Sequence, residues 1–368
     1  MSGRLWPLVA AALLVGSSLA VFALALNEGK SDTYSVTTMA VRYEVVVTNA
    51  GPGDAESIPL TVALVRDSLP NQRVLSTDIW PTPLRTYNDT MGNTFVVFFI
   101  ERLLAGQRFT ATFNATVELR NMDINIRPGT GGTYGGEEDA FLQPNALADS
   151  THSSVVAKAR ELQAASGDVY ETVWNIYNFA VDKVVYQQLP GEWPASWVIE
   201  HGEGGSAELG NVFVALARAS GIPARRVSGW GTDFNTSEPL TVNRFAHGWA
   251  EFYMPGYGWV PADPTWGKVH RFDNLARPDD HHVVMTKGEA IHFFDRGAYT
   301  SPSGDASVST DYRLTTLSRS TVTVSLEHGI VLAFLYGLPF LFAAVAAHKV
   351  WLVRREAGRQ GHEDMDGG

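Results

Sequence analysis

Hydrophobic positions follow two different periods along the chain. Four short runs in its first third are rich in β-branched and aromatic residues, and turn-forming stretches such as residues 49–53 separate them. Evenly spaced short strands without helices between them must pack sheet on sheet. The pattern therefore predicts an antiparallel β-sandwich domain over residues 33–126. The four runs are residues 43–47, 60–65, 94–100 and 109–113.

A helical pattern replaces the strand pattern further along. Residues 127–136 are Gly-rich and lack periodicity, which is typical of a linker, so we place a domain boundary there. Beyond it, apolar residues recur at spacings of three and four and predict helices over residues 155–165 and 169–181. The second domain, assigned to residues 137–310, therefore contains helices as well as strands.

Two uncharged apolar segments lie near the ends of the chain. The first, residues 5–26, is long enough to cross a hydrocarbon core, which requires about 20 apolar residues. It also fits a cleavable signal peptide, because Ala23-Leu24-Ala25 has the pattern of a processing site. Residues 1–30 are therefore interpreted as either an N-terminal transmembrane anchor or a signal peptide.

The second apolar segment, residues 329–347, is followed directly by basic residues, as expected of a cytoplasmic flank. This favours a transmembrane helix over residues 329–353 and a cytoplasmic tail over residues 354–368, rather than a buried core helix. The main domains are then expected on the extracytoplasmic side of the cell membrane. Three glycosylation sequons agree with that placement. They lie at Asn88, Asn114 and Asn235.

Composition narrows the chemistry that the chain can perform. The formal net charge of −11 and the pI near 5.4 argue against a nucleic-acid-binding surface. The chain contains no cysteine, which excludes disulfides, thiolate metal sites and thiol catalysis. Any covalent chemistry must therefore use an oxygen or nitrogen nucleophile.

Ser206 is the first candidate for such a nucleophile. It follows Gly204-Gly205 and opens a segment whose apolar residues fall on one helical face, before Gly221 and Pro223 end the helix. The exposed N–H groups and the dipole at a helix N-terminus favour negative charge, which suits a nucleophile or a developing oxyanion. Serine is also a preferred N-cap residue, so capping alone is the competing interpretation.

His247 and Asp263 are the second and third candidates. Two strands joined by the turn at Pro255 predict a hairpin, and each of the two residues lies eight positions from that proline. They are therefore expected nearly opposite each other, close enough for a carboxylate to orient an imidazole. A register error of one residue would turn one side chain to the other face. Glu251 shares the predicted face of His247 and is either an alternative orienting carboxylate or a solvated charge.

A metal or cofactor site is not expected. His281 and His282, with His270 and His292, match no familiar ligand spacing, and adjacent histidines on a strand point in opposite directions. No dense carboxylate loop suggests calcium binding. We therefore predict neither a metal site nor a cofactor.

These motifs resemble the core of the transglutaminase-like superfamily, most strongly over residues 155–265. The resemblance implies a papain-like α+β fold with a Cys, His, Asp triad whose cysteine begins a helix. It places His247 as the general base and Asp263 as its orienter, with Ser206 at the position of the nucleophilic cysteine. The matching strings are Gly204-Gly205-Ser206, Gly221-Ile222-Pro223-Ala224-Arg225, His247-Gly248-Trp249-Ala250-Glu251 and Asp263-Pro264-Thr265.

Serine at that position leaves three hypotheses. A thiol ionises readily beside an imidazole and a hydroxyl does not, which favours a pseudoenzyme that binds a peptide or a cell-envelope protein. Alternatively, Ser206, His247 and Asp263 form the triad of a serine-based amidase, peptidase or acyl transferase. A third hypothesis is that Ser206 is an engineered replacement of cysteine.

Overall fold

The computed structural model describes residues 33–122, 124, 126, 134, 136–231, 240–241, 246–268, 274–288 and 293–325, with 348–349 and 351–352. Within them, residues from Tyr34 to Val322 form one compact unit. No helix among the described residues is long and apolar enough to span a bilayer. Both predicted membrane segments, residues 5–26 and 329–347, lie outside the described residues.

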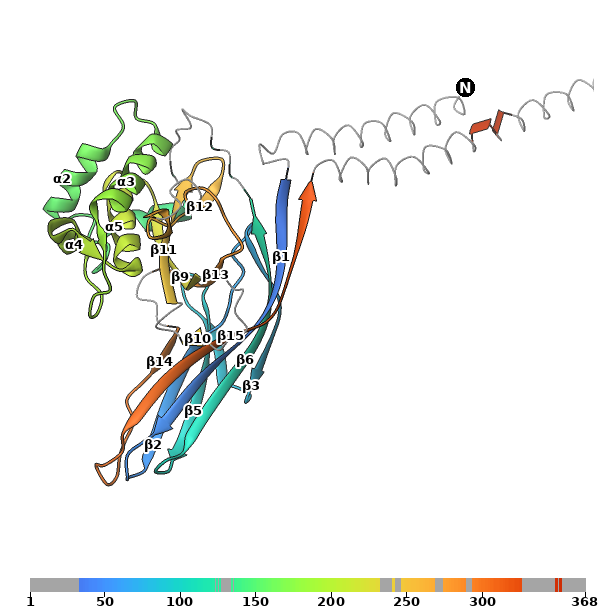
Figure 1. Ribbon diagram of the computed structural model, residues 1–368, viewed down its shortest axis with the longest axis vertical. Coiled ribbons are helices and arrows are strands. Elements are labelled where there is room, and N and C mark those ends of the chain that lie inside the picture. The colour runs from blue at the N-terminus through green and yellow to red at the C-terminus, as the bar shows by residue number, and fades with distance from the viewer. Residues whose placement is uncertain are drawn as a thin grey trace, which may run out of the picture. The chain divides into compact units, whose positions relative to one another are not determined.

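Two antiparallel sheets form the β-rich half of the compact unit (Figure 1). The larger has the strand order β10-β15-β1-β6-β3 and the smaller the order β14-β2-β5-β4. The strands are β1 (Thr33–Asn49), β2 (Ala55–Ala63), β3 (Gln72–Trp80), β4 (Arg85–Asn88), β5 (Thr94–Leu103), β6 (Arg108–Asn121), β10 (Leu240–Thr241), β14 (Phe294–Arg296) and β15 (Val308–Ser325).

The two sheets share one apolar core. Alternate residues of β1 point inward because successive side chains of a strand face opposite sides, and Tyr43 among them is fully buried. Its ring stacks on Phe113 of β6 at a centroid distance of 4.6 Å. Phe98 of β5, in the other sheet, meets Phe113 edge-on at 6.1 Å. This packing is the sheet-on-sheet arrangement that the strand pattern predicts.

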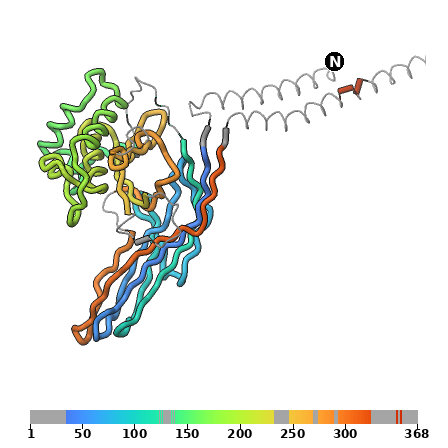
Figure 2. The backbone as a smooth tube through the Cα atoms, viewed as in Figure 1, coloured from blue at the N-terminus to red at the C-terminus, as the bar shows by residue number. Residues whose placement is uncertain are grey.

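The sheets draw strands from both ends of the described chain. Figure 2 shows β1 and β15, the blue and the orange-red strand, running side by side in the larger sheet. Likewise, β14 pairs with β2 in the smaller sheet. The predicted division into residues 33–126 and 137–310 leaves these later strands out of the sandwich. Pairing between distant strands leaves no local pattern in the sequence, which is why the division missed it.

The other half is an α+β unit built on a third sheet, of order β12-β11-β9-β13. Its strands are β9 (Ala224–Gly231), β11 (Ala246–Met254), β12 (Gly258–Ala262) and β13 (His282–Lys287). Its helices are α2 (Ser153–Leu162), α3 (Val169–Lys183), α4 (Ala195–His201) and α5 (Ser206–Ala219). Short pieces complete it: η1 (Glu137–Leu142), η2 (Trp266–Lys268) and the parallel pair β7 (Val185–Tyr186) and β8 (Glu203–Gly204).

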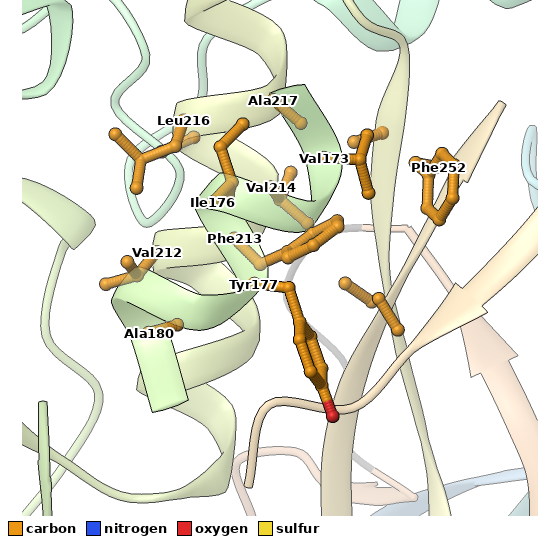
Figure 3. Packing of buried hydrophobic residues seen from close by; sticks show 14 of the residues in the cluster. Val173, Ile176, Tyr177, Ala180, Val212, Phe213, Val214, Leu216, Ala217 and Phe252 are labelled. Atoms are coloured by element: carbon orange, nitrogen blue, oxygen red, sulfur yellow. The ribbon is translucent and has the colours of Figure 1, made fainter. Parts of the chain in front are cut away.

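Helix α5 is buried at the centre of this half. Its apolar face packs with α3 and β11, where Tyr177, Phe213 and Phe252 meet in one core (Figure 3). The helix lies unusually close to β11, since a Cβ added to Gly210 would sit 3.2 Å from the carbonyl oxygen of Trp249. Close backbone approach of this kind requires glycine. It holds the start of α5 against the strand that carries His247.

The two halves also share core residues. Trp230 of β9 is buried in the apolar core of the β-rich half, where its ring meets Tyr43 at a centroid distance of 5.4 Å. Val283 and Met285 of β13 enter the same core. The strands that frame the predicted site are therefore anchored in the β-rich half.

Candidate functional site

Ser206 is the first residue of α5, and its hydroxyl is not used for capping. Gly205 occupies the N-cap position, and its N–H donates to Glu208 Oε2 at 3.0 Å. Glu208 Oε1 accepts a second bond, from the Trp193 N–H at 3.3 Å. Ser206 Oγ instead accepts a long hydrogen bond of 3.4 Å from the N–H of Gly248. The capping interpretation of Ser206 is therefore wrong, because Gly205 is the N-cap residue and Ser206 Oγ is hydrogen-bonded to Gly248 instead.

His247 and Asp263 meet as predicted. His247 Nε2 lies 2.7 Å from Asp263 Oδ2, and both residues are buried. The register differs slightly from the expected one: Ala250 pairs with Ala262, so the continuing ladder sets Asp263 opposite Trp249. Trp249 is two residues from His247, and a shift of two keeps both side chains on one face.

The turn after β12 fixes the Asp263 carboxylate. Oδ1 accepts the backbone N–H of Thr265 at 2.8 Å and that of Trp266 at 3.2 Å. Oδ2 is thereby left to face the imidazole of His247. The Asp-Pro-Thr string thus both opens a turn and orients the imidazole.

His282 joins the site although no role was predicted for it. Its Nε2 lies 3.0 Å from the same Asp263 Oδ2. Its Nδ1 lies 2.8 and 2.9 Å from the two carboxylate oxygens of Asp279. Only the pairing of β13 with β9, which sets His282 opposite Gly231, brings it here. The expectation that adjacent histidines diverge is confirmed, because His282 is buried while the side chain of His281 is 38% exposed.

Negative and positive side chains alternate in the hydrogen-bonded series Asp279, His282 and Asp263. Burial by itself would raise the pKa of Asp263, but His247 and His282 hold it well below its usual range. Burial would similarly raise the pKa of Asp279, and His282 lowers it. Burial would lower the pKa of His282, but Asp279 and Asp263 together raise it to about 10. His282 is therefore an imidazolium at neutral pH, held between two carboxylates.

His247, Asp263 and His282 also form the one group in the described residues whose donor atoms are gathered closely enough to hold a metal ion, all within 4.8 Å of one another. Both imidazoles approach a single carboxylate oxygen at hydrogen-bond length. We therefore interpret the group as a hydrogen-bond network. Of the other histidines considered, His270 and His292 lie outside the described residues.

Glu251 is neither an orienter of His247 nor a solvated charge. It is buried and binds Lys287 Nζ at 2.8 Å and Arg225 Nη2 at 2.8 Å. Residues two apart on a strand share a face, but Glu251 pairs with these cations on β9 and β13 and not with His247. The predicted alternatives for Glu251 are therefore both wrong.

A cavity of about 370 Å³ opens over Ser206 and His247, which both line it. Arg226 and Glu192 form part of its wall and are joined by two hydrogen bonds of 2.9 and 3.1 Å. Among the described contacts, no hydrogen bond joins Ser206 Oγ to His247. The cavity nevertheless gives a carbonyl group access to the hydroxyl and the imidazole together.

A buried helix that begins at the nucleophile position and packs on a strand bearing the histidine defines a papain-like α+β fold. Residues 156–264 match the family model of the transglutaminase-like superfamily. The chain therefore contains a core domain of that superfamily, as its motifs predict.

Several known proteins are similar to parts of this chain. A crystal structure from Cytophaga hutchinsonii, assigned as a cysteine protease, superposes with a TM-score of 0.54 at 17% identity over 78% of this chain and 99% of that one. The uncharacterized protein YebA of Bacillus subtilis is 26% identical over 43% of this chain and 23% of its own length. A protein-glutamine gamma-glutamyltransferase of Pseudomonas aeruginosa is 40% identical over 16% of this chain and 9% of its own length. The chain thus spans less than a quarter of either curated relative.

Proposed function

We propose that the cavity over Ser206 is an acyl-transfer site acting on an amide or ester. Ser206 Oγ attacks the carbonyl carbon, and its proton passes to His247 Nδ1, the ring nitrogen not engaged by Asp263. The proton then goes to the departing amine or alcohol, which leaves an acyl ester on Ser206. Water or a second amine then attacks the ester carbon and gives a proton to His247, which passes it to Ser206 Oγ as the acyl–oxygen bond breaks and the product leaves.

One observation carries this proposal: the Ser206 hydroxyl does not cap α5, and it lines the same cavity as an imidazole held by a buried carboxylate. The hydroxyl instead accepts the long hydrogen bond of 3.4 Å from the Gly248 N–H. The N–H groups of the first turn of α5 are suitable donors for the oxyanion of the tetrahedral intermediate. One similar protein is named a protein-glutamine gamma-glutamyltransferase, and that name denotes an acyl transfer, which supports the reaction class.

A second candidate function is peptide binding without turnover. The Gly248 N–H occupies a lone pair of Ser206 Oγ, and a hydroxyl that is not bonded to the base is less ready for attack. This candidate retains the cavity and its walls as a binding site. It corresponds to the pseudoenzyme hypothesis of the sequence analysis.

We also propose that the site faces the extracytoplasmic side of a membrane, where it meets peptide or cell-envelope protein partners. The apolar segments at residues 5–26 and 329–347 and the basic residues after the second support this placement. Protease digestion of intact cells tests it. We expect the folded unit to be cleaved from outside, and protection until the cells are lysed would contradict the topology.

Activity on a panel of amides and esters decides between the two functions. The unaltered chain is compared with three variants: Ser206→Cys, Ser206→Ala and His247→Ala. Acyl transfer predicts turnover by the unaltered chain that Ser206→Ala and His247→Ala abolish. Turnover by Ser206→Cys alone would show an intact site that serine leaves without a nucleophile, and would favour the binding function. Retention of activity in Ser206→Ala would place the chemistry elsewhere.

A further inference from the structure

His282 changes the charge balance of the site. In a three-residue site, the carboxylate supplies one negative charge to the imidazolium that forms when the base takes a proton. Here the Asp263 carboxylate is already hydrogen-bonded to the His282 imidazolium at 3.0 Å. Asp263 and His282 together are therefore neutral, and by themselves would stabilise a protonated His247 less than an isolated carboxylate would.

Asp279 restores the missing negative charge. Its carboxylate oxygens lie 2.8 and 2.9 Å from His282 Nδ1. Asp263, His282 and Asp279 together carry a net charge of −1, the same as one isolated carboxylate. Asp279 is itself fixed, because its Oδ1 accepts the backbone N–H groups of His281 and His282 at 2.8 and 3.0 Å.

Burial makes this balance matter. His282 is 7% exposed, and its ring centroid lies 5.4 Å from that of His247. Repulsion between two imidazolium rings at that separation is screened less in a buried site than at the surface. Trp249 and Trp266 pack against both rings, with centroids 4.9 and 4.3 Å from His282 and 5.7 and 5.6 Å from His247.

The remaining charged groups near His282 do not replace Asp279. Asp280 binds Arg319 at 2.7 Å and its other oxygen lies 3.6 Å from His281. Glu251, on the β11 face that also carries His247, is occupied by Lys287 and Arg225. Asp263 and Asp279 are thus the two carboxylates that contact the His282 ring within the described residues.

We propose that His282 and Asp279 are positioning residues of the Ser206 site: His282 bridges two carboxylates and fixes Asp263, and Asp279 supplies the net negative charge that stabilises a protonated His247. The proposal rests on the acyl-transfer function proposed above. Both residues lie beyond the segment that matches the family model, which ends at residue 264. They are therefore a feature of this chain that the matched core does not contain.

The protonation of His282 tests the proposal without any catalysis. Full-length chain with ¹⁵N-labelled histidine is examined by NMR between pH 6 and 9, and the His282 signals are assigned by their loss in His282→Gln. We expect both His282 nitrogens to be protonated throughout, in the unaltered chain and in Ser206→Ala alike. An unprotonated His282 nitrogen at pH 7 would overturn the proposal, whether or not the protein is an enzyme.

A double-mutant cycle tests the charge balance by the rate of Ser206 acylation with an activated ester. Asp279→Asn leaves the partners of His247 neutral where His282 stays protonated, which the same NMR measurement checks in that variant, and is then expected to slow acylation about tenfold or more. His282→Gln added to Asp279→Asn returns their net charge to −1, so the double variant is expected to be faster than Asp279→Asn alone. Losses that simply accumulate would contradict the proposed charge balance, since a merely structural role gives no rescue.

Two controls separate the possible causes of a slow or absent acylation. His281→Gln alters the neighbouring, partly exposed imidazole, which does not contact Asp263, and is expected to leave the rate within about twofold. If the unaltered chain is not acylated at all, the proposed function fails. The cycle is then measured in the Ser206→Cys background, where rescue or its absence still decides the role of His282 and Asp279.

Discussion

Replacement of Glu251 by glutamine is expected to destabilise the protein severely, although the residue takes no part in the proposed chemistry. The Glu251 carboxylate lies between Lys287 Nζ, at 2.8 and 3.0 Å from its two oxygens, and Arg225, whose Nε and Nη2 lie 2.9 and 2.8 Å from Oε2. It joins β11 to β13 and β9 beneath the His247 site. Glutamine would deprive the buried Lys287 and the partly buried Arg225 of their shared carboxylate.

The magnitude follows from the charges in the cluster. Burial would raise the pKa of Glu251, but Lys287 and Arg225 lower it from 4.5 to about 2, which corresponds to about 3 kcal/mol in favour of the carboxylate. The Lys287 ammonium shows the opposite effect: burial outweighs Glu251 and lowers its pKa from 10.5 to about 8. The intact cluster therefore adds little net stability, whereas loss of its one carboxylate costs about 3–5 kcal/mol.

Urea unfolding, followed by tryptophan fluorescence, measures this loss at pH 7, where Lys287 is charged in the unaltered chain. Glu161→Gln is the matched control, because Glu161 pairs with Lys158 on the surface and its side chain is 65% exposed. It is expected to cost less than about 1 kcal/mol. Adding Lys287→Met to Glu251→Gln should recover part of the stability, since the remaining Arg225 is stacked 3.8 Å from the Trp259 ring. A loss from Glu251→Gln no larger than that of the control would refute the reasoning.

Three further outcomes are expected. Gly231→Ala would place a Cβ 2.7 Å from His247 Cδ2 and displace the imidazole. Acylation of Ser206, followed as a progress curve, should therefore slow about tenfold or more. An unchanged rate would mean that the ring tolerates the shift. The Asp168 side chain caps α3 by accepting the Glu171 N–H at 2.8 Å. Asp168→Ala should therefore lower the free energy of unfolding in urea by about 1 kcal/mol. An unchanged unfolding midpoint would contradict the capping role. Because the pKa of Glu251 is lowered on folding, its contribution to stability is complete above pH 4.5 and declines as the pH falls toward 2. The difference in the free energy of unfolding between the unaltered chain and Glu251→Gln should therefore narrow as the pH is lowered. A constant difference would argue against the lowered pKa.

Local patterns predicted the parts of the structure that depend on neighbours in the sequence. The alternating strand residues around Tyr43 predicted the sheets, and the Gly-Gly pair followed by an apolar helical face located the start of α5 at Ser206. The hairpin count placed Asp263 beside His247 despite a register offset of two residues, because an even offset preserves the face. These features are set by periodicity and turn chemistry.

The remaining parts depend on contacts between distant segments. Strands β14 and β15 enter the β-rich sheets from the far end of the chain, and no local signal reveals which strands they will join. His282 reaches Asp263 only through the pairing of β13 with β9. Glu251 was misjudged for the same reason, since its partners Arg225 and Lys287 lie on two other strands.

The most direct test of the proposed function is covalent labelling of Ser206. The unaltered chain is treated with a serine-directed phosphonylating probe, and intact-mass and peptide-mass spectrometry locate the adduct. We expect one adduct on Ser206, none in Ser206→Ala, and labelling that is about 100-fold slower or worse in His247→Ala, because a general base contributes at least that factor. An unlabelled Ser206 in folded protein, or equal labelling without His247, would contradict the proposed acyl-transfer site.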